Sequence, residues 1–223
     1  MKKEIDKSLP MYSKGEEIFN AVTHIVGGGF GIIVLLLCTI FGVKNNHSPL
    51  EIFGFVIYGI SMILLYTMSS IYHFLRRNKA KKLFRIFDHC TIYFLIAGTY
   101  TPICLSVLKN NIWGNIILGL VWICSIIGIV FNAINMHKKS IKILSMILYV
   151  VMGWCIILAI KPLLDSWSIQ GFIWMLVGGI AYTVGIIFYG LGKNHKYIHS
   201  IWHLFVLLGT ILQFIAIFVY IIL

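Results

Sequence analysis

The sequence predicts an all-α membrane protein, a bundle of seven transmembrane helices with a cytosolic N-terminus and an external C-terminus. Of its 223 residues, 60% are hydrophobic and only 11% are charged, and the mean hydropathy is +0.94. The apolar residues form seven long runs, and the basic residues gather in the connections between them. A soluble domain carries about 25% charged residues. This composition therefore excludes a cytosolic globular enzyme and a disordered chain.

Each apolar run is long enough to cross a bilayer as a helix, which takes about 20 residues. The runs show no polar and apolar alternation, so membrane-spanning strands are not expected. Residues 1–15 form a polar cytosolic tail without the pattern of a removable signal peptide. The connections are short, and a single domain is predicted over residues 1–223. The predicted spans are Ile18–Val43, Leu50–Phe74, Leu83–Val107, Ile112–Ile134, Ile141–Ile160, Ile169–Leu191 and Ile198–Leu223.

The orientation follows from the positions of the 18 lysines and arginines. Fifteen of them lie in the N-terminal tail or flank the connections after the second, fourth and sixth runs. The other side holds only Lys44, Lys109 and Lys161. Basic residues stay preferentially on the cytosolic side. The net charge of +11 is thus a topology signal in a plasma-membrane protein, and no nucleic-acid partner is expected.

Three further features of the runs have structural interpretations. The glycines between Gly27 and Gly31 predict a close contact between two helices. Pro102 is expected to kink the third helix near its middle, because it removes a backbone hydrogen bond. The five cysteines lie in or beside apolar runs and include no CxxC pair. A disulfide framework and a thiolate metal site are therefore not expected.

Ionisable side chains inside membrane spans are the main candidates for function. His73, Asp88, His199 and His203 all lie a few residues from the basic flanks on the cytosolic side. At about 1.5 Å per residue, they share one depth, roughly 5–12 Å from those flanks. His199 and His203 are four residues apart and can bind one metal ion from one helical face. Together with His73 they form the predicted metal site, where an ionised Asp88 would hold a bound water.

Some neighbouring residues allow more than one interpretation. His195 and His199 have the same spacing as the preferred pair, but His195 lies between Lys193 and Lys196 and is expected in a solvated loop. The preferred pair, His199 and His203, also has a structural interpretation, in which both rings lie at a helix end and form hydrogen bonds with neighbouring groups. Ser69, one turn deeper than the second-helix histidine, either supports the site or bonds its own helix carbonyl.

Two other sets of polar residues are expected to join helices. Glu17, Asn20 and His24 lie along one side of the first helix near its cytosolic start. Interhelical hydrogen bonding is the preferred interpretation for all three, with direct metal ligation as the alternative. His89 points about 100° away from Asp88 around the helix, so we expect it to bond a neighbouring helix.

At these residues the chain resembles the hemolysin III family, the bacterial branch of the progestin and adipoQ receptor superfamily that includes the adiponectin receptors. The resemblance implies seven helices, an inside N-terminus and a zinc ion near the cytosolic face. In the family arrangement the three histidines ligate zinc, and the aspartate contacts the zinc-bound water. The residues that match are His73, His199 and His203 for the ligands, Asp88 for the aspartate and Ser69 for the family's serine. The matching segments are Glu17–His24, Ser69–His73, Phe87–Pro102 and His199–Val206.

Three protein ligands and an open position are typical of catalytic zinc. The leading hypothesis is a ceramidase-like hydrolase that cleaves an amide or ester in a membrane lipid. In it His73, His199 and His203 bind zinc, Asp88 is the general base and Ser69 assists. One alternative is a channel or cytolysin of the hemolysin III type, although a secreted toxin should be water-soluble before it inserts. Another is a non-enzymatic sensor or regulator of membrane lipid state.

Overall fold

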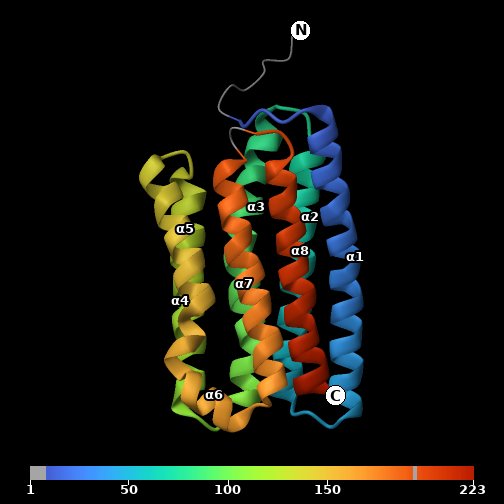
Figure 1. Cartoon of the computed structure of the whole chain (residues 1–223), viewed down its shortest axis with the longest axis vertical. Coiled ribbons are helices and arrows are strands. Elements are labelled where there is room, and N and C mark those ends of the chain that lie inside the picture. Colours follow the sequence, from blue (N-terminus) through green and yellow to red (C-terminus); the bar gives the residue numbers. More distant parts are fainter. Residues whose placement is uncertain (1–8, 193–194) are drawn as a thin grey trace.

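The computed structural model describes residues 9–192 and 195–223, and within these ranges it contains helices and no strand (Figure 1). In this described part of the chain, seven helical segments are long and apolar enough to cross a membrane, as predicted. Pro102 and Trp154 each mark a change of helix type within a segment. The elements are α1 (Lys14–Lys44), α2 (Pro49–Phe74), α3 (Lys79–Pro102), η1 (Ile103–Val107), α4 (Ile112–Asn135), α5 (Lys139–Trp154), η2 (Cys155–Ala159), α6 (Ile160–Ser166), α7 (Ile169–Leu191), α8 (Ile198–Ile217) and η3 (Phe218–Ile222).

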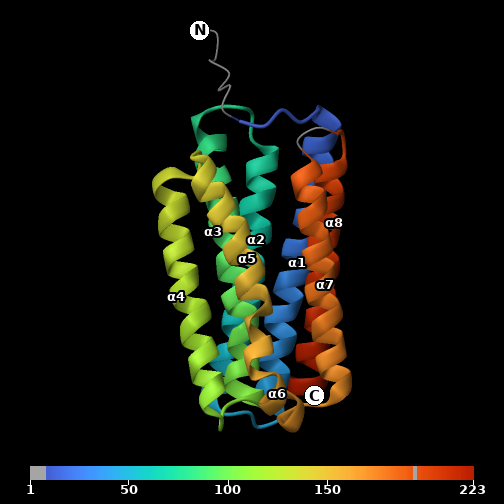
Figure 2. The same ribbon diagram turned by 60° about the vertical axis from the view of Figure 1, so that its left-hand side comes forward.

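The helices run side by side, up and down along one axis (Figures 1 and 2). Successive helices pack together from α1 to α4, α7 packs along α8, and contact between α1 and α8 closes the bundle. Contact between α5 and α7 is sparse. We call the end at which α1 and α8 begin and α2 finishes the N-terminal end. The C-terminus lies at the opposite end (Figure 1).

The first two helices begin at capping boxes. The Ser13 hydroxyl accepts from the backbone N–H of Glu16, whose carboxylate accepts from the Ser13 N–H in return. Ser48 and Glu51 form the same pair at the start of α2. Each box satisfies N–H groups that a helix start otherwise leaves without partners. These caps fix the residues at which α1 and α2 begin.

The fifth span differs in length and form from the predicted Ile141–Ile160. It extends over Lys139–Ser166, and its α-helical geometry is interrupted by the 3-10 segment between α5 and α6. Pro162 explains the break, because it has no N–H to donate and its ring crowds the preceding turn. In the structure Pro162 lies in the first turn of α6, where a missing N–H costs nothing.

The sequence predicts a kink at Pro102 near the middle of the third helix. In the structure Pro102 lies instead at the end of the α-helical part. The α-helix continues to Pro102 itself, and the following residues, Ile103–Val107, wind as a π-helix. Because Pro102 cannot donate to the carbonyl four residues earlier, the regular ladder changes there. Single π turns of this kind are typical of functional or strained positions in helices.

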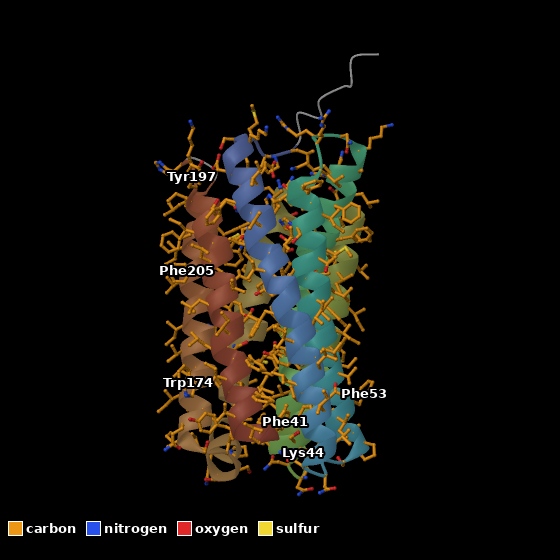
Figure 3. All side chains as sticks on the ribbon, turned by 90° about the vertical axis from the view of Figure 1, so that its right-hand side faces the viewer. Phe41, Lys44, Phe53, Trp174, Tyr197 and Phe205 are labelled. Carbon is orange, nitrogen blue, oxygen red and sulfur yellow. The ribbon has the colours of Figure 1, made fainter. Side chains whose placement is uncertain are left out.

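The expected contact at the glycine cluster is confirmed between α1 and α2. A Cβ at Gly27 would lie 2.5 Å from the ring of Tyr66, and one at Gly31 would lie 3.1 Å from the backbone of Ile63. Large apolar side chains cover the outside of the bundle; one of them is Phe53, which is exposed on α2 (Figure 3). This apolar exterior suits lipid contact, so the polar side chains buried inside need a separate explanation.

Candidate metal centre

Three buried histidines meet at the N-terminal end of the bundle. His73 lies in the last turn of α2, and His199 and His203 lie in the first two turns of α8. Each offers one ring nitrogen to a group whose members all lie within 4.8 Å of one another. The fold therefore brings together the imidazoles that spacing and depth had singled out, from helices more than 120 residues apart in the sequence.

The α8 pair has a separation suited to a shared ion. The Nε2 atoms of His199 and His203 lie 3.2 Å apart. Two nitrogens bound to one tetrahedral ion at about 2.0–2.1 Å lie about 3.3–3.4 Å from each other. Little movement of this pair is therefore needed to accept a metal.

His73 is oriented by a carboxylate on the first helix. Its Nδ1 lies 2.8 Å from Oε2 of Glu17, and the other oxygen of Glu17 accepts from Nζ of Lys81 at 2.6 Å. A carboxylate can only accept, so Nδ1 of His73 carries a proton, and in the neutral ring the lone pair is then on Nε2. A carboxylate behind a ligating imidazole is the usual outer support of a metal site. This confirms the expected interhelical hydrogen bond for Glu17.

Lys81 has a different environment from the one its sequence position suggests. It belongs to the basic connection after the second span, where lysines and arginines are expected to face the cytosol, yet only 1% of its surface is exposed. Its ammonium group also donates to the carbonyls of His73 and Leu75, at 3.4 and 3.1 Å. Lys81 is the third residue of α3, so the start of this helix lies against the end of α2 and its charge is buried against Glu17.

The buried ring nitrogens of the cluster support a metal directly. Nε2 of His73, which faces the α8 histidines, has no hydrogen-bond partner among the described residues. The great majority of buried polar atoms in proteins are satisfied. Neutral imidazoles suit zinc, copper, nickel or iron, so the donor set fits a divalent ion of this class. The cluster could therefore hold a metal ion, whose identity the ligands alone do not select.

Asp88 and Ser69 lie on the wall of the cavity beside this cluster. The Ser69 hydroxyl and the His89 ring both face the Asp88 carboxylate. Of the two serines in this turn, it is Ser70 that donates to its own helix, bonding the carbonyl of Tyr66 at 2.7 Å. The hydroxyl of Ser69 is thus directed toward the site.

His89 bonds a neighbouring helix, as expected. Its Nδ1 donates to the carbonyl of Arg85 at 2.9 Å, which leaves Nε2 to accept from the hydroxyl of Tyr189 on α7 at 3.2 Å. His89 also lies 3.4 Å from Asp88 through Nδ1. It connects α3 to α7 beside the site and is absent from the three-histidine group.

A short segment before the first helix covers the site, and sequence reasoning did not find it. The ring of Tyr12 stacks on His199 with 4.8 Å between centroids, at an interplanar angle of 18°. The segment is held because Arg77 donates to the carbonyl of Leu9 at 2.7 Å and Leu9 is buried. Burial, reinforced by nearby Tyr189, raises the pKa of Tyr12 well above its usual value, so its hydroxyl stays protonated. We call residues 9–12 the N-terminal strap.

The preferred interpretation of the polar residues on the first helix is wrong for two of the three. Asn20 and His24 are buried, but neither amide atom of Asn20 and neither ring nitrogen of His24 has a hydrogen-bond partner among the described residues. His24 lies outside the three-histidine group, although its ring centroid is 3.8 Å from that of His203. Glu17 alone makes the expected interhelical bond.

The two members of the competing pair, His195 and His199, lie in different surroundings. His195 is exposed in the connection before α8, as expected, whereas His199 is buried. The lysines of the orientation argument that fall in the tail and in this connection lie outside the described residues; they are Lys2, Lys3, Lys7 and Lys193.

A cavity of about 400 Å³ extends from the strap past the histidines toward the middle of the bundle. Its polar end includes Asp88, Ser69 and His24, and its far end reaches Gln213, ten residues beyond His203 on α8. The wall between them is mostly apolar and aromatic. Such a cavity is within the usual size range of small-molecule sites.

Comparison with known proteins identifies the family. The family model described as Haemolysin-III related matches residues 12–214. The chain belongs to the hemolysin III family. It is 42% identical to hemolysin-3 of Bacillus cereus over 206 residues, which cover 92% of both chains. It is also 42% identical to a hemolysin-3 homolog of Bacillus subtilis (strain 168) over 210 residues, 94% of this chain and 96% of that one.

A more distant similarity reaches animal proteins. The human monocyte to macrophage differentiation factor is 24% identical over 169 residues, 74% of this chain and 68% of the human one. The family match and the seven apolar helices together make this a multi-pass membrane protein. The resemblance stated from the motifs is thereby confirmed.

Proposed function

We propose that the protein is a zinc-dependent hydrolase of an amide or ester bond in a membrane lipid, and that its N-terminal end faces the cytosol. The observation that carries this proposal is the free, buried Nε2 of His73 facing the α8 histidines beside an open cavity. A structural metal site has no need of such a cavity. Asp88 on its wall supplies the acid–base group that hydrolysis requires.

The reaction follows from the chemistry of the surrounding side chains. His73, His199 and His203 would hold the zinc ion, which would lower the pKa of a bound water to about 7 and polarise a carbonyl group. Asp88 accepts a proton from the attacking water and returns it to the leaving amine or alcohol. Ser69 donates a hydrogen bond that orients the Asp88 carboxylate, and Glu17 holds His73 in the tautomer that leaves Nε2 free.

The shape of the cavity supports a lipid substrate. Its polar groups lie at the N-terminal end, and apolar side chains such as Leu65, Met175 and Val206 line it farther in. A lipid could place its amide or ester beside the histidines and its hydrocarbon chain along the apolar wall. Water-soluble substrates would gain nothing from the apolar part.

The charge distribution over the described residues supports the orientation. Lys44, Lys109 and Lys161 lie at the opposite end of the bundle, and Lys44 is visible there in Figure 3. Cytosolic ends of membrane proteins are enriched in basic residues. The described lysines and arginines at the N-terminal end of the bundle are Lys14, Arg76, Arg77, Lys79, Lys81, Lys82, Arg85, Lys138, Lys139, Lys142 and Lys196.

The test combines metal analysis with an assay of fatty-acid release. Protein purified in detergent is expected to contain one zinc per chain and to release fatty acid from at least one member of a panel of N-acyl amides and acyl esters. His203→Ala should lose both properties. His195→Ala is the matched control, because this exposed histidine has the same spacing to His199 and should keep both.

Two results would contradict the proposal in different ways. If the purified protein contained no metal, the proposed metal centre would be wrong. If the protein contained zinc and bound lipids but released no product over the whole panel, the proposed hydrolase activity would be wrong. A sensor of membrane lipid state would then be favoured.

The names of the Bacillus relatives favour a second candidate, a channel or other device that makes membranes leak. Liposomes loaded with a fluorescent dye and reconstituted with the protein distinguish the two. Leakage that persists in His199→Ala and His203→Ala variants would support permeabilisation independent of the metal centre. Tight liposomes at high protein density would exclude it.

A further inference from the structure

Asn20 and His24 present four polar atoms that the described part of the protein leaves without partners. Both side chains are almost completely buried. Both amide atoms of Asn20 and both ring nitrogens of His24 lack a hydrogen bond. The two residues are four apart in α1, so they share one face of that helix. This concentration of unsatisfied atoms at one place is unusual for a folded protein.

The position of His24 is fixed by packing. Its ring stands edge-on to Tyr66 at 5.0 Å and tilted over His203 at 3.8 Å between centroids. Tyr66 is itself fixed, because Gly27 leaves room for its ring and its hydroxyl bonds Thr210 at 2.7 Å. The imidazole is thus held in place while both of its nitrogens remain available.

The location of His24 connects its two ring nitrogens to the candidate site; Asn20 is one turn away on α1 and does not line the cavity. His24 lines the same cavity as Asp88, His199 and His203. Its nitrogens nevertheless fall outside the group that could share one metal ion. A partner for His24 would therefore lie next to the metal centre without replacing one of its three ligands.

The chemistry of the partner follows from the atoms that are free. A neutral imidazole has one donor and one acceptor, and a primary amide has both kinds as well. A group that both donates and accepts in a small space is a hydroxyl. A carboxylate or a carbonyl would satisfy only the donors, and a cation would satisfy only the acceptors.

We propose that the free ring nitrogens of His24 form a hydroxyl-binding site beside the three-histidine centre, filled by a water molecule or by an alcohol group of the lipid substrate. The water form stands independently of the proposed function. The alcohol form rests on it, and it specifies the substrate as a lipid amide or ester that carries a hydroxyl close to the scissile bond.

The first test compares two replacements of similar size, His24→Gln and His24→Leu. If a hydroxyl fills the site, the glutamine can bond it, and His24→Gln should melt at a higher temperature than His24→Leu. If nothing fills the site, the order reverses, because a buried amide without partners is less stable than an apolar side chain. Equal or reversed melting temperatures would overturn the proposal.

Metal content provides an independent readout in the same variants. Both should contain as much metal as the unmodified protein, because His24 is placed outside the ligand set. Loss of metal from both variants would instead make His24 a ligand and would also overturn the proposal.

The source of the hydroxyl is tested by lipid binding without turnover. The probes are an N-acyl amide of a long-chain amino alcohol and its analogue lacking the hydroxyl. A larger rise in melting temperature with the hydroxylated probe, abolished in His24→Leu, supports the lipid alcohol. Equal rises, with His24→Gln still above His24→Leu, support water. Because neither outcome depends on hydrolysis, absence of fatty-acid release would contradict only the proposed function.

Discussion

Glu17 holds His73 by a 2.8 Å contact between Oε2 and Nδ1, so a carboxylate on the first helix sets the tautomer of an imidazole at the end of the second. The same carboxylate neutralises the buried Lys81 on the third helix. One acidic side chain therefore joins three helices and directs a free nitrogen toward the α8 histidines.

Glu17→Gln tests this support. The amide keeps the size of the side chain but loses the charge, so it cannot favour the Nδ1–H tautomer as strongly. We expect metal affinity to fall by about 10–100-fold, the usual effect of losing an outer-shell partner. The measurement is a competition titration against a chelator of known affinity.

Glu16→Gln is the control for that variant. Glu16 is the adjacent carboxylate, but it bonds the Ser13 and Tyr197 backbone N–H groups and does not contact the cluster. Its metal affinity should match that of the unmodified protein. Equal affinities for all three proteins would show that Glu17 plays no part in metal binding.

Metal removal should lower stability, because an ion that binds only the folded state stabilises it. At a free concentration 100 times Kd, the gain is about 2.7 kcal/mol. We expect dialysis against a chelator to reduce the melting temperature and added zinc to restore it. His203→Ala should melt at the same temperature with and without zinc. A zinc response preserved in that variant would place the ion elsewhere.

The N-terminal strap should slow the escape of the metal. Tyr12 covers His199, and the strap is held by Arg77 at Leu9. We expect Tyr12→Ala to speed metal release to excess chelator several-fold while leaving equilibrium metal content close to normal. Stopped-flow or manual mixing with a coloured chelator measures the rate.

Met11→Ala is the matched control for the strap, since Met11 is the preceding residue and 83% exposed. Its release rate should be unchanged. If Tyr12→Ala and Met11→Ala release metal at the same rate as the unmodified protein, the strap does not control access to the site.

The contact between the first two helices predicts opposite effects at two nearby glycines. Gly27→Ala places a Cβ 2.5 Å from the ring of Tyr66 and should destabilise the protein by about 1–3 kcal/mol through overpacking. Gly29→Ala meets nothing within 4 Å and should be neutral or stabilising, by up to about 1 kcal/mol, because alanine favours the helix. Thermal unfolding in one detergent compares the two. A destabilised Gly29→Ala together with an unaffected Gly27→Ala would refute the packing described.

The candidate cluster was accessible to sequence reasoning because depth in a membrane is encoded along the chain. His73 lies just before the basic connection that ends α2, and His199 and His203 lie just after the one that precedes α8. Rise per residue converts these positions into a common level. The four-residue spacing of the α8 pair then places both rings on one side of their helix.

Other parts of the site left no comparable signal. Tyr12 belongs to a polar tail, and nothing in its neighbours indicates that the segment folds back over His199. Lys81 is one of several basic residues in its connection and differs from them only in its contact with Glu17. Aromatic spacing along α7 does not reveal that Tyr189 meets His89. Each of these contacts joins segments whose relative rotation the sequence does not specify.

By itself, the sequence determined the number of membrane-crossing helices, their approximate bounds and the level at which the ionisable side chains lie. The bilayer imposes these through hydropathy and length, which are properties of single segments. Only the tertiary structure decided which faces meet: that Glu17 contacts His73, that the strap closes over the cluster, and that Asn20 and His24 face the interior without partners. Helix rotation and packing settle those contacts, and they depend on all seven spans at once.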